Sequence, residues 1–481
     1  MADNKPLVLD VDGTFLKTDI LYECFWAGLG QNPRETLKAV FAFATDPPRL
    51  KRRLAEFVTL RTDLLPTNPD MLALAQETAA QGREVVLASA SDFEIVTQLA
   101  QNYKLSDTVF ASDGEINLKG EAKAKALVAA YGEEGFHYAG NDRSDREIWK
   151  HADGVIMVGD LPAIDQSLTA SGKNIAKYSG GWKVKQLIRA LRPHQWVKNV
   201  LLFLPMLAAH DFRLHTLLLV LLGIAAFSAA ASSIYIVNDL LDLEADRLHP
   251  KKKNRPFASG AVPIKIGMVA FVVLALIALG IGAFLGGGFL LVIVVYMLLS
   301  LAYSLKLKRM RWVDIATLAS LYTLRVVAGA EASHVEASVF MLIFIFPVFI
   351  ALGCVKRLTE LTLATSDERL PGRGYGRADR DDLLNVAGIG IAGALVIFFL
   401  YSFSEQAVAL YPTRWLLWVA LVPLAWWLIR MVRLGYQGKQ DYDPIVFAMS
   451  DKRGLGIIML TLSLMFYAAG LWQQWFALLM Q

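Results

Sequence analysis

Residues 238–256 read NDLLDLEADRLHPKKKNRP, four carboxylates followed at once by five cationic side chains. The stretch continues the apolar segment IAAFSAAASSIYIV, residues 224–237. Asp239, Asp242 and Asp246 are spaced three and four apart, so on a continuous helix they project from one face. Such a face suits Mg²⁺, which binds one or two carboxylates together with substrate phosphates, while the cations hold the rest of a polyanion. The alternative is a solvated loop in which acids and bases simply pair.

Outward from this stretch, the chain divides into two halves of different composition. It has 481 residues, which is too many for one ordinary domain. Its hydrophobic fraction of 55% is high for a soluble protein. Residues 1 to about 180 carry charges throughout, whereas long apolar runs recur from about 195 onward. Cys24 and Cys354 lie in different halves, which argues against a disulfide framework and agrees with a reducing compartment. An export signal is not recognisable, so we expect the N-terminal half to stay in the cytoplasm.

The second half is predicted to be an all-α polytopic membrane domain, because a spanning helix needs about 20 mainly apolar residues. Nine candidate spans lie near 198–210, 215–238, 265–284, 287–305, 313–332, 336–355, 386–404, 413–432 and 454–474. Lys and Arg concentrate in alternate loops, which predicts a cytoplasmic N-terminus and an external C-terminus in the cytoplasmic (inner) membrane. The segment GWKVKQLIRALR, residues 181–192, has the pattern of an amphipathic helix on the inner leaflet.

The opening stretch resembles the first aspartate-rich motif of the UbiA superfamily of intramembrane prenyltransferases, and the resemblance extends over about residues 185–481. It implies that Asp239, Asp242 and Asp246 are catalytic and hold Mg²⁺ on a diphosphate. Where the family has a second acidic cluster, in the loop after the sixth span, this chain reads CVKRLTEL, residues 354–361. Two cations, Lys356 and Arg357, are better suited to a directly bound phosphate monoester than to a second magnesium diphosphate.

Further segments resemble the branch of that family that makes decaprenyl-phosphate phosphoribose: LRPHQWVKNVLLFLP (191–205), YSLKLKRMRWVD (303–314), YTLRVVAGA (322–330) and GRGYGRAD (372–379). In that branch phosphoribosyl diphosphate is the donor and a polyprenyl phosphate is the acceptor. The substrate-binding candidates that follow are Lys198, Asn199, Asn238, Arg247, Lys253, Arg255, Tyr303, Lys306, Arg325, Lys356, Arg357, Glu360 and Tyr375.

Arg325 is a separate clue, because it lies about 13 residues into the fifth predicted span, or roughly 20 Å at 1.5 Å per residue. A charge at that depth should face a cavity or a partner rather than lipid. It either bounds the substrate cleft or forms a packing ion pair with Glu331 or another buried acid.

The first half is predicted to be an α/β domain with a Rossmann-like parallel sheet, because apolar strands alternate with helical patterns. PLVLDVDGTFLKTD, residues 6–19, resembles the first motif of the haloacid dehalogenase (HAD) superfamily, followed in order by REVVLASAS (83–91), GEAKAKAL (120–127) and FHYAGNDRSD (136–145). Residues 16–78 fit an inserted helical cap. The domains expected are a HAD-like domain at 1–175, a linker with the interfacial helix at 176–195 and the membrane domain at 196–481.

The HAD resemblance assigns roles at the strand tips. Asp10 is the nucleophile, Asp12 protonates the leaving oxygen, and Ser89 and Lys123 contact the phosphoryl group, with Lys125 as the fallback for Lys123. Thr14 is added as a substrate-binding candidate. The Mg²⁺ ligands implied are Asp10, Asp12, Asn141 and Asp145. Asn141 stands where the family usually has an aspartate, which favours weaker metal binding.

Together the halves predict a bifunctional membrane enzyme with one Mg²⁺ in each domain. The membrane domain would transfer 5-phosphoribose from phosphoribosyl diphosphate to a polyprenyl phosphate, and the HAD domain would remove the 5-phosphate. One alternative is an aromatic prenyltransferase with an unrelated HAD activity. The other is a non-catalytic lipid-binding or transport protein. Nucleic acid is not expected as a partner.

Overall fold

A computed structural model describes residues 4–336, 338–364, 369, 373–440 and 443–479. It separates into two compact units, Met1–Leu191 with Tyr235–Phe271, and Arg192–Ile234 with Val272–Gln481. The seven residues 365–368 and 370–372 of the expected cytoplasmic loop after the sixth span lie outside the described residues.

The first unit is built on a six-stranded, all-parallel sheet in the order β3-β2-β1-β4-β5-β6. The strands are β1 Leu7–Asp10, β2 Val85–Asp92, β3 Val109–Ser112, β4 His137–Gly140, β5 Gly154–Val158 and β6 Asn174–Tyr178. Strand β1 is buried on both faces, with Leu7 and Leu9 packed on one side and Val8 on the other. An apolar run without alternation is what a parallel strand covered on both faces requires.

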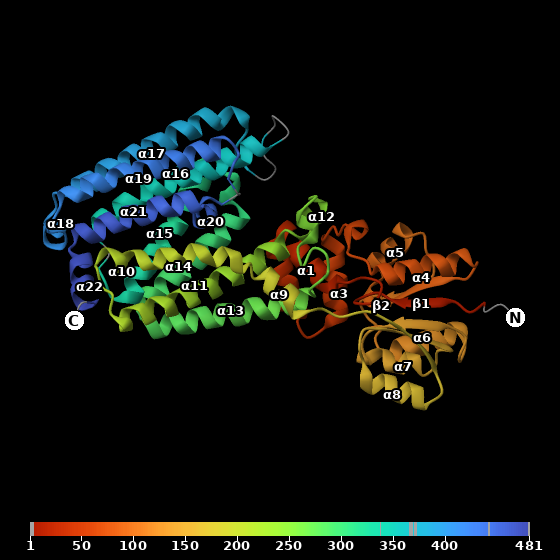
Figure 1. The fold of residues 1–481 in the computed structure, drawn as a ribbon. Coiled ribbons are helices and arrows are strands. Elements are labelled where there is room, and N and C mark those ends of the chain that lie inside the picture. The colour runs from red at the N-terminus through yellow and green to blue at the C-terminus, as the bar shows by residue number, and fades with distance from the viewer. Residues whose placement is uncertain (1–3, 337, 365–368, 370–372, 441–442, 480–481) are drawn as a thin grey trace. The chain divides into compact units, whose positions relative to one another are not determined.

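Helices cover both faces of this sheet (Figure 1). Helices α4 (Pro69–Ala80) and α5 (Phe93–Asn102) lie on one face, and α6 (Glu121–Tyr131), α7 (Arg146–Trp149) and α8 (Pro162–Ala170) lie on the other. The predicted α/β architecture is confirmed. Strand β6 extends the sheet past residue 175, and the short helix α9 (Val184–Ala190) follows it with Val184 and Ile188 exposed.

The segment between β1 and β2 is helical, as predicted for a cap. It holds α1 (Ile20–Gln31), α2 (Pro33–Phe43), α3 (Pro47–Phe57) and the 3₁₀ turn η1 (Thr62–Leu64). Asp19 caps α1 by accepting a hydrogen bond from the Leu21 N–H, and prolines occupy the first turn of α2 and α3, where a missing N–H costs nothing. The range expected for the cap, 16–78, also includes most of α4, whose Met71 and Ala75 pack in the core beside the sheet.

Seven helices in the described part of the chain are long and apolar enough to cross a bilayer: α11 (Leu214–Leu241), α13 (Ile264–Leu285), α14 (Gly287–Leu305), α15 (Val313–Ser333), α16 (Val339–Leu363), α17 (Arg380–Tyr401) and α19 (Trp415–Tyr436). Helices α21 (Lys452–Ala468) and α22 (Leu471–Leu479), bent by 78°, make an eighth span if taken together. Shorter helices α18 (Glu405–Leu410) and α20 (Pro444–Ser450) connect them. The protein is therefore an integral membrane protein.

The first of the nine predicted spans differs from the prediction. Residues 198–210 fall on the 3₁₀ helix η3 (Pro193–Phe203) and the five-residue helix α10 (Leu204–Ala208). The segment nevertheless runs beside α15: Lys198 contacts Tyr322, Asn199 bonds Arg325, and the Leu202 carbonyl lies against Gly329, where an added Cβ would be 2.1 Å away. A 3₁₀ helix rises about 2.0 Å per residue, so this short segment covers more depth than an α-helix of its length.

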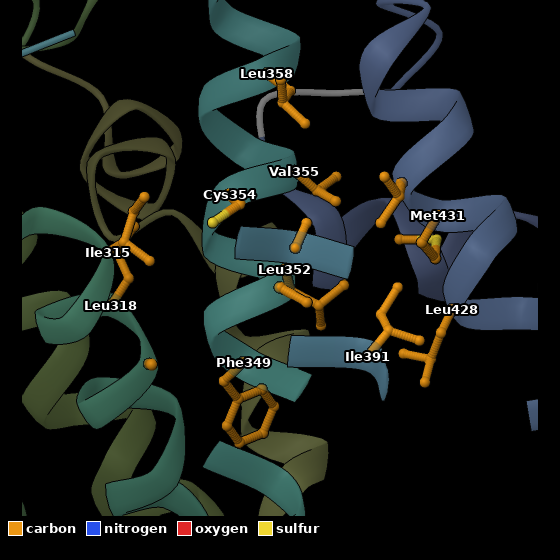
Figure 2. Close-up of a cluster of buried hydrophobic side chains, with 14 of the residues drawn as sticks. Ile315, Leu318, Phe349, Leu352, Cys354, Val355, Leu358, Ile391, Leu428 and Met431 are labelled. Carbon is orange, nitrogen blue, oxygen red and sulfur yellow. The ribbon is translucent and has the colours of Figure 1, made fainter. Parts of the chain in front are cut away.

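Helices α15, α16, α17 and α19 share one apolar core (Figure 2). Figure 2 shows Ile315 of α15 on one side of Leu352 and Val355 of α16, with Ile391 of α17 and Leu428 of α19 on the other. The 25-residue helix α16 extends to Leu363, eight residues beyond its predicted end. Lys356, Arg357 and Glu360 therefore lie on this helix and not, as predicted, in the loop after it.

Candidate active sites

The carboxyl ends of β1, β2 and β4 bring together the residues predicted from the HAD resemblance. Asp10 ends β1, and Lys123 reaches it from α6 with an Nζ to Oδ1 distance of 2.6 Å. The same ammonium donates to the Ala88 carbonyl at 3.2 Å and to the Tyr138 hydroxyl at 3.1 Å. Lys123 is 3% exposed, so its charge is committed to this site. Lys125, the fallback, is exposed and pairs with Glu121.

Asp12 is held by the end of β2. Its Oδ2 accepts hydrogen bonds from the Ser89 hydroxyl at 3.1 Å and the Ser91 hydroxyl at 2.8 Å, and its Oδ1 accepts the Ile20 N–H at 2.8 Å. The Thr14 hydroxyl donates to Asp10 at 3.3 Å. Ser91 was not predicted, although its place two residues after Ser89 on one strand puts both side chains on the same face.

Asp145 closes the site from the β4 side. Its Oδ2 accepts the backbone N–H groups of Asn141 and Asp142 at 3.0 and 2.9 Å, and its Oδ1 accepts the Tyr138 hydroxyl at 2.9 Å. Tyr138 thus links Lys123 to Asp145, a role that the sequence analysis missed. Gly13 has a φ of 81°, and a Cβ there would lie 2.1 Å from Nδ2 of Asn141, so this position needs glycine.

The acidity of these groups reflects their burial. Desolvation raises the pKa of Asp10 to about 7; Lys123 opposes the rise, whereas Asp145 and Asp12 add to it. Desolvation also lowers the pKa of the Lys51 ammonium, which reaches the site from cap helix α3, and the charges of Asp12 and Asp19 oppose that shift. Lys51 was not among the predicted site residues, because a lysine in RLKRRLAEF reads as one of several solvated cations.

The aspartate-rich stretch forms a second acidic site. Helix α11 ends at Leu241, Asp242 adopts a non-helical conformation, and the new helix α12 (Leu243–Leu248) begins after it. The prediction of one continuous helical face is therefore wrong. The break nevertheless brings Asp239 and Asp246 to the same guanidinium: Arg255 donates from Nη1 to both, at 3.1 and 2.6 Å. Both aspartates are 2% exposed.

The cations that follow this stretch have separate positions. Arg247 pairs with buried Glu23 at 2.5 Å, in the same unit, and also donates to the Ala258 carbonyl. Lys253 is exposed on the 3₁₀ turn η4 (Lys252–Asn254). Arg255, in contrast, forms ion pairs with two residues of the acidic cluster, Asp239 and Asp246.

The polar side chains of the two sites indicate whether Mg²⁺ could bind there. Among the described residues, no group of three or more His, Cys, Asp or Glu side chains is already arranged around a metal position. At both sites, however, a cation of the chain lies against the carboxylates, Lys123 at Asp10 and Arg255 between Asp239 and Asp246. Beside Asp239, the buried Oδ1 of Asn238 has no hydrogen-bond partner within the described ranges of the chain. Carboxylate and amide oxygens are the donors that Mg²⁺ prefers, so both sets of residues fit the ion.

The cations of α16 divide into one buried and one accessible group. Arg357 has a fully buried side chain, 2.5 Å from Asp314 and paired with Glu360, and it bonds the Tyr303 hydroxyl at 2.9 Å. Its predicted contact with a substrate phosphate does not match this placement, because its charge is already neutralised by two carboxylates. Asp314, the acid that makes Arg357 structural, was missed although it ends the quoted segment 303–314.

Tyr375 and Lys306 are further predicted residues of this region, and Arg373 adds a contact that was not predicted. Tyr375 is fully buried and its hydroxyl accepts the Trp312 N–H at 2.7 Å, so it supports the loop rather than facing solvent. Arg373 reaches the Tyr303 hydroxyl at 3.3 Å. Lys306, the residue after α14, is exposed.

Lys356 and Lys198 converge on Asp443. The Lys198 ammonium lies 2.6 Å from Oδ2 of Asp443, the Lys356 ammonium 3.5 Å from the same oxygen, and the Tyr322 hydroxyl 3.2 Å from it. Burial alone would raise the pKa of Asp443, but the two lysines together hold it below its ordinary value. Two cations around one carboxylate leave an excess positive charge. Asp443 was missed because it lies about 87 residues from Lys356, far beyond any local spacing pattern.

Arg325 is held by neutral polar groups and by aromatic rings. It donates to Asn199 Oδ1 at 3.1 Å, to the Leu321 carbonyl at 2.6 Å and to the Tyr296 hydroxyl at 3.0 Å. The rings of Phe227, Tyr296 and Tyr322 lie within 5.7 Å of its guanidinium carbon. This environment satisfies a buried guanidinium through hydrogen bonds and cation–π contacts.

The helical part of this chain carries an aspartate-rich helix end and a cluster of cations, the two features expected of an intramembrane transferase. The sequence profile of the UbiA prenyltransferase family matches residues 200–451. The chain is 34% identical over 455 residues to the uncharacterized protein y4nM of Sinorhizobium fredii, covering 93% of this chain and 88% of that protein. The chain therefore belongs to the UbiA prenyltransferase family.

Two further comparisons concern parts of the chain. A decaprenyl-phosphate phosphoribosyltransferase of Corynebacterium glutamicum is 44% identical over 186 residues, or 37% of this chain and 55% of that enzyme. A solved UbiA homologue of Archaeoglobus fulgidus, bound to GPP and Mg²⁺, matches with a TM-score of 0.46 and 14% identity, covering 59% of this chain and 99% of that one.

Proposed function

We propose that this protein transfers 5-phosphoribose from phosphoribosyl diphosphate to a polyprenyl phosphate and then removes the 5-phosphate with its HAD domain. The observation that carries the transferase part is the pairing of Lys198 and Lys356 on Asp443. Lys356 occupies the position where the family resemblance predicts a second acidic cluster, and a site with excess positive charge favours a bare phosphate over a second magnesium diphosphate. The similarity to decaprenyl-phosphate phosphoribosyltransferases supports the same substrates.

In the transfer, an oxygen of the lipid phosphate attacks C1 of the phosphoribosyl donor, the C1–O bond to the diphosphate breaks, and diphosphate leaves. We assign the lipid phosphate to Lys198 and Lys356 and the diphosphate to Arg255 and its neighbours. The nucleophile is already an anion near neutral pH, so these side chains position the reactants and a strong general base is not needed. Asp239, Asp242, Asp246 and Asn238 would hold Mg²⁺, which supplies charge neutralisation for the leaving diphosphate.

In the hydrolysis, the Asp10 carboxylate attacks the phosphorus of the 5-phosphate, and the ribose 5-oxygen leaves with a proton from Asp12. Water then attacks the aspartyl phosphate, Asp12 takes its proton, and inorganic phosphate leaves. Lys123 and Ser89 hold the phosphoryl oxygens. Asp10, Asp145 and oxygens of Asp12 and Asn141 would hold Mg²⁺, which offsets the negative charge between nucleophile and phosphate.

The positive loops favour an orientation with the HAD domain in the cytoplasm, at the inner membrane. Segment η3–α10 supports a first crossing at the predicted place: 11 residues of 3₁₀ helix and five of α-helix, at about 2.0 and 1.5 Å per residue, reach roughly 30 Å. That length is comparable to the hydrocarbon core of a bilayer.

The test uses purified full-length protein with Mg²⁺, polyprenyl phosphate and phosphoribosyl diphosphate labelled in its ribose. We expect label in the lipid fraction and release of diphosphate. Labelled polyprenyl diphosphate with an aromatic acceptor is the comparison arm for an aromatic prenyltransferase. Transfer of the prenyl label to the aromatic acceptor, without transfer of the ribose label to lipid, would overturn the proposal, as would transfer in neither arm with a protein shown to be folded.

A further inference from the structure

Cap helix α3 places a second lysine at the mouth of the HAD site. The Lys51 ammonium donates to the Ala90 carbonyl at 2.6 Å. Ala90 lies between Ser89 and Ser91, the two serines that hold Asp12. Lys51 therefore stands beside the reacting groups, but it approaches from the cap and not, as Lys123 does, from the helices under the sheet.

Neighbouring contacts fix α3 in this position. Arg52 donates to Glu94 at 2.9 Å and lies 3.6 Å from Asp92, both at the start of α5. The Asp92 side chain caps α5 by accepting the Glu94 N–H. The cap is thus tied to the strand end by the side chain that follows Lys51, so the approach of Lys51 does not depend on its own rotamer alone.

The hydrogen bonding of Lys51 is incomplete. An ammonium group carries three donors, and in the described part of the chain Lys51 has one hydrogen bond and no carboxylate within 4.0 Å. Lys123, by contrast, donates to three acceptors. The remaining donors of Lys51 have no protein acceptor in the described residues and are available to an anionic ligand. Lys119 and Lys123 lie within electrostatic reach of Lys51, and Asp12 and Asp19 balance part of that charge.

We propose that Lys51 forms a subsite for a second anionic group, so that the HAD domain selects phosphomonoesters that carry another phosphate elsewhere on the same sugar. This inference rests on the phosphatase activity proposed above. The phosphoribosylated lipid has that chemistry, with a 5-phosphate monoester at Asp10 and a phosphodiester at C1. Phosphoribosyl diphosphate has it too, with a diphosphate at C1. Lys123 serves the transferred group, and Lys51 serves the group that stays on the sugar.

The test compares phosphate release by the full-length protein from ribose 5-phosphate, ribose 1,5-bisphosphate and phosphoribosyl diphosphate, without a lipid acceptor. We expect kcat/KM for the two substrates with a second anion to exceed that for ribose 5-phosphate by about tenfold, the size of one charge-assisted hydrogen bond. Lys51→Met should abolish this preference by raising KM for those two substrates, with kcat nearly unchanged, and Lys51→Arg should restore it. The ranking of the two substrates identifies which C1 group fits better.

Lys38→Met is the matched control, because Lys38 lies on cap helix α2 and its exposed ammonium pairs with Glu35. It should leave the preference intact. If Lys51→Met lowers activity on all three substrates equally, the residue only holds the cap and the subsite is overturned. Equal kcat/KM values in the unmodified protein overturn the subsite alone, whereas hydrolysis of none of the three overturns the proposed phosphatase and this inference with it.

Discussion

The two acidic sites of this protein both hold a cation of the chain, but they hold it differently. In the N-terminal α/β domain Lys123 is buried, with its side chain 4% exposed, and it donates to a carboxylate, a carbonyl and a hydroxyl. In the aspartate-rich site the Arg255 side chain is 27% exposed and pairs with two carboxylates, those of Asp239 and Asp246. Lys123, buried and held by three different kinds of acceptor, is a fixed part of its site. For Arg255, which is more exposed and held by two carboxylates, we expect exchange for another cation.

The two sites also differ in how regular the backbone is that carries their carboxylates. Asp10 ends a central strand of a sheet covered on both faces, where neighbouring strands fix its position. Asp242 instead lies at a break between two helices, with φ and ψ of −100° and 14°. The site at the strand ends is therefore preorganised by regular structure, whereas the aspartate-rich site lies at a junction between two helices.

Replacing the preorganised nucleophile gives the largest expected effect. Asp10→Asn keeps the size of the side chain but cannot form the acyl phosphate, so phosphate release should fall by about 10³-fold or more. Lipid labelling from phosphoribosyl diphosphate should continue, and mass spectrometry should find the 5-phosphate still attached. Asp107→Asn, an exposed control, should change neither step. Normal dephosphorylation by Asp10→Asn would break the assignment of the HAD site to the second step.

The second-largest loss of activity is expected at the aspartate-rich site. Asp239→Asn removes one of the two charges that meet at Arg255, and transfer of label to lipid should fall by about 10²- to 10³-fold, as for loss of one electrostatic contact to a leaving group. Hydrolysis of ribose 5-phosphate should stay within about twofold. Glu244→Gln is the matched control, because Glu244 lies in the same acidic stretch but is exposed. Equal losses in both variants would show that general acidity, and not this cluster, matters.

The sequence predicted the site residues that belong to local motifs, and it missed those whose partners lie far away along the chain. Asp10, Ser89 and Lys123 were found because each follows a strand or begins a helix in a recognisable local motif, and a parallel sheet brings strand ends to one edge. Asp239 and Asp246 were found by spacing, but the helix break at Asp242 was not, since DLLDLEAD has no glycine or proline to mark it.

Other residues carried no local signal. Asp443 pairs with Lys198 and Lys356, and Asp314 pairs with Arg357, all of them distant in the sequence. The residues around Asp443 and Asp314 in the sequence do not indicate these partners. The same limit explains why Lys356 and Arg357, adjacent in sequence, were predicted to act together. Successive residues on a helix point about 100° apart, so Arg357 turns into the ion-pair network with Asp314 while Lys356 faces Asp443.

A moderate effect is expected at the cationic cluster of the membrane domain. Asp443→Asn removes the carboxylate that holds Lys198 and Lys356 in place, so KM for polyprenyl phosphate should rise by about tenfold with a smaller change in kcat. Lys356→Met should raise the same KM, while Asp381→Asn, an exposed acid on α17, should not. Elution as a single species in detergent checks folding. An unchanged KM in Asp443→Asn would assign the lipid phosphate to other residues.

The smallest effect tests the exchangeable cation itself. Arg255→Gln frees Asp239 and Asp246 from their ion pairs, so the Mg²⁺ concentration for half-maximal transfer should fall by about two- to fivefold, because the metal no longer competes with a guanidinium. If Arg255 moves to the donor once the metal is bound, KM for phosphoribosyl diphosphate should rise by a similar factor. The Mg²⁺ dependence of phosphate release at the HAD site should not change. A higher Mg²⁺ requirement in Arg255→Gln would mean that the guanidinium holds the carboxylates in their binding geometry, and that both sites are then preorganised by a fixed cation.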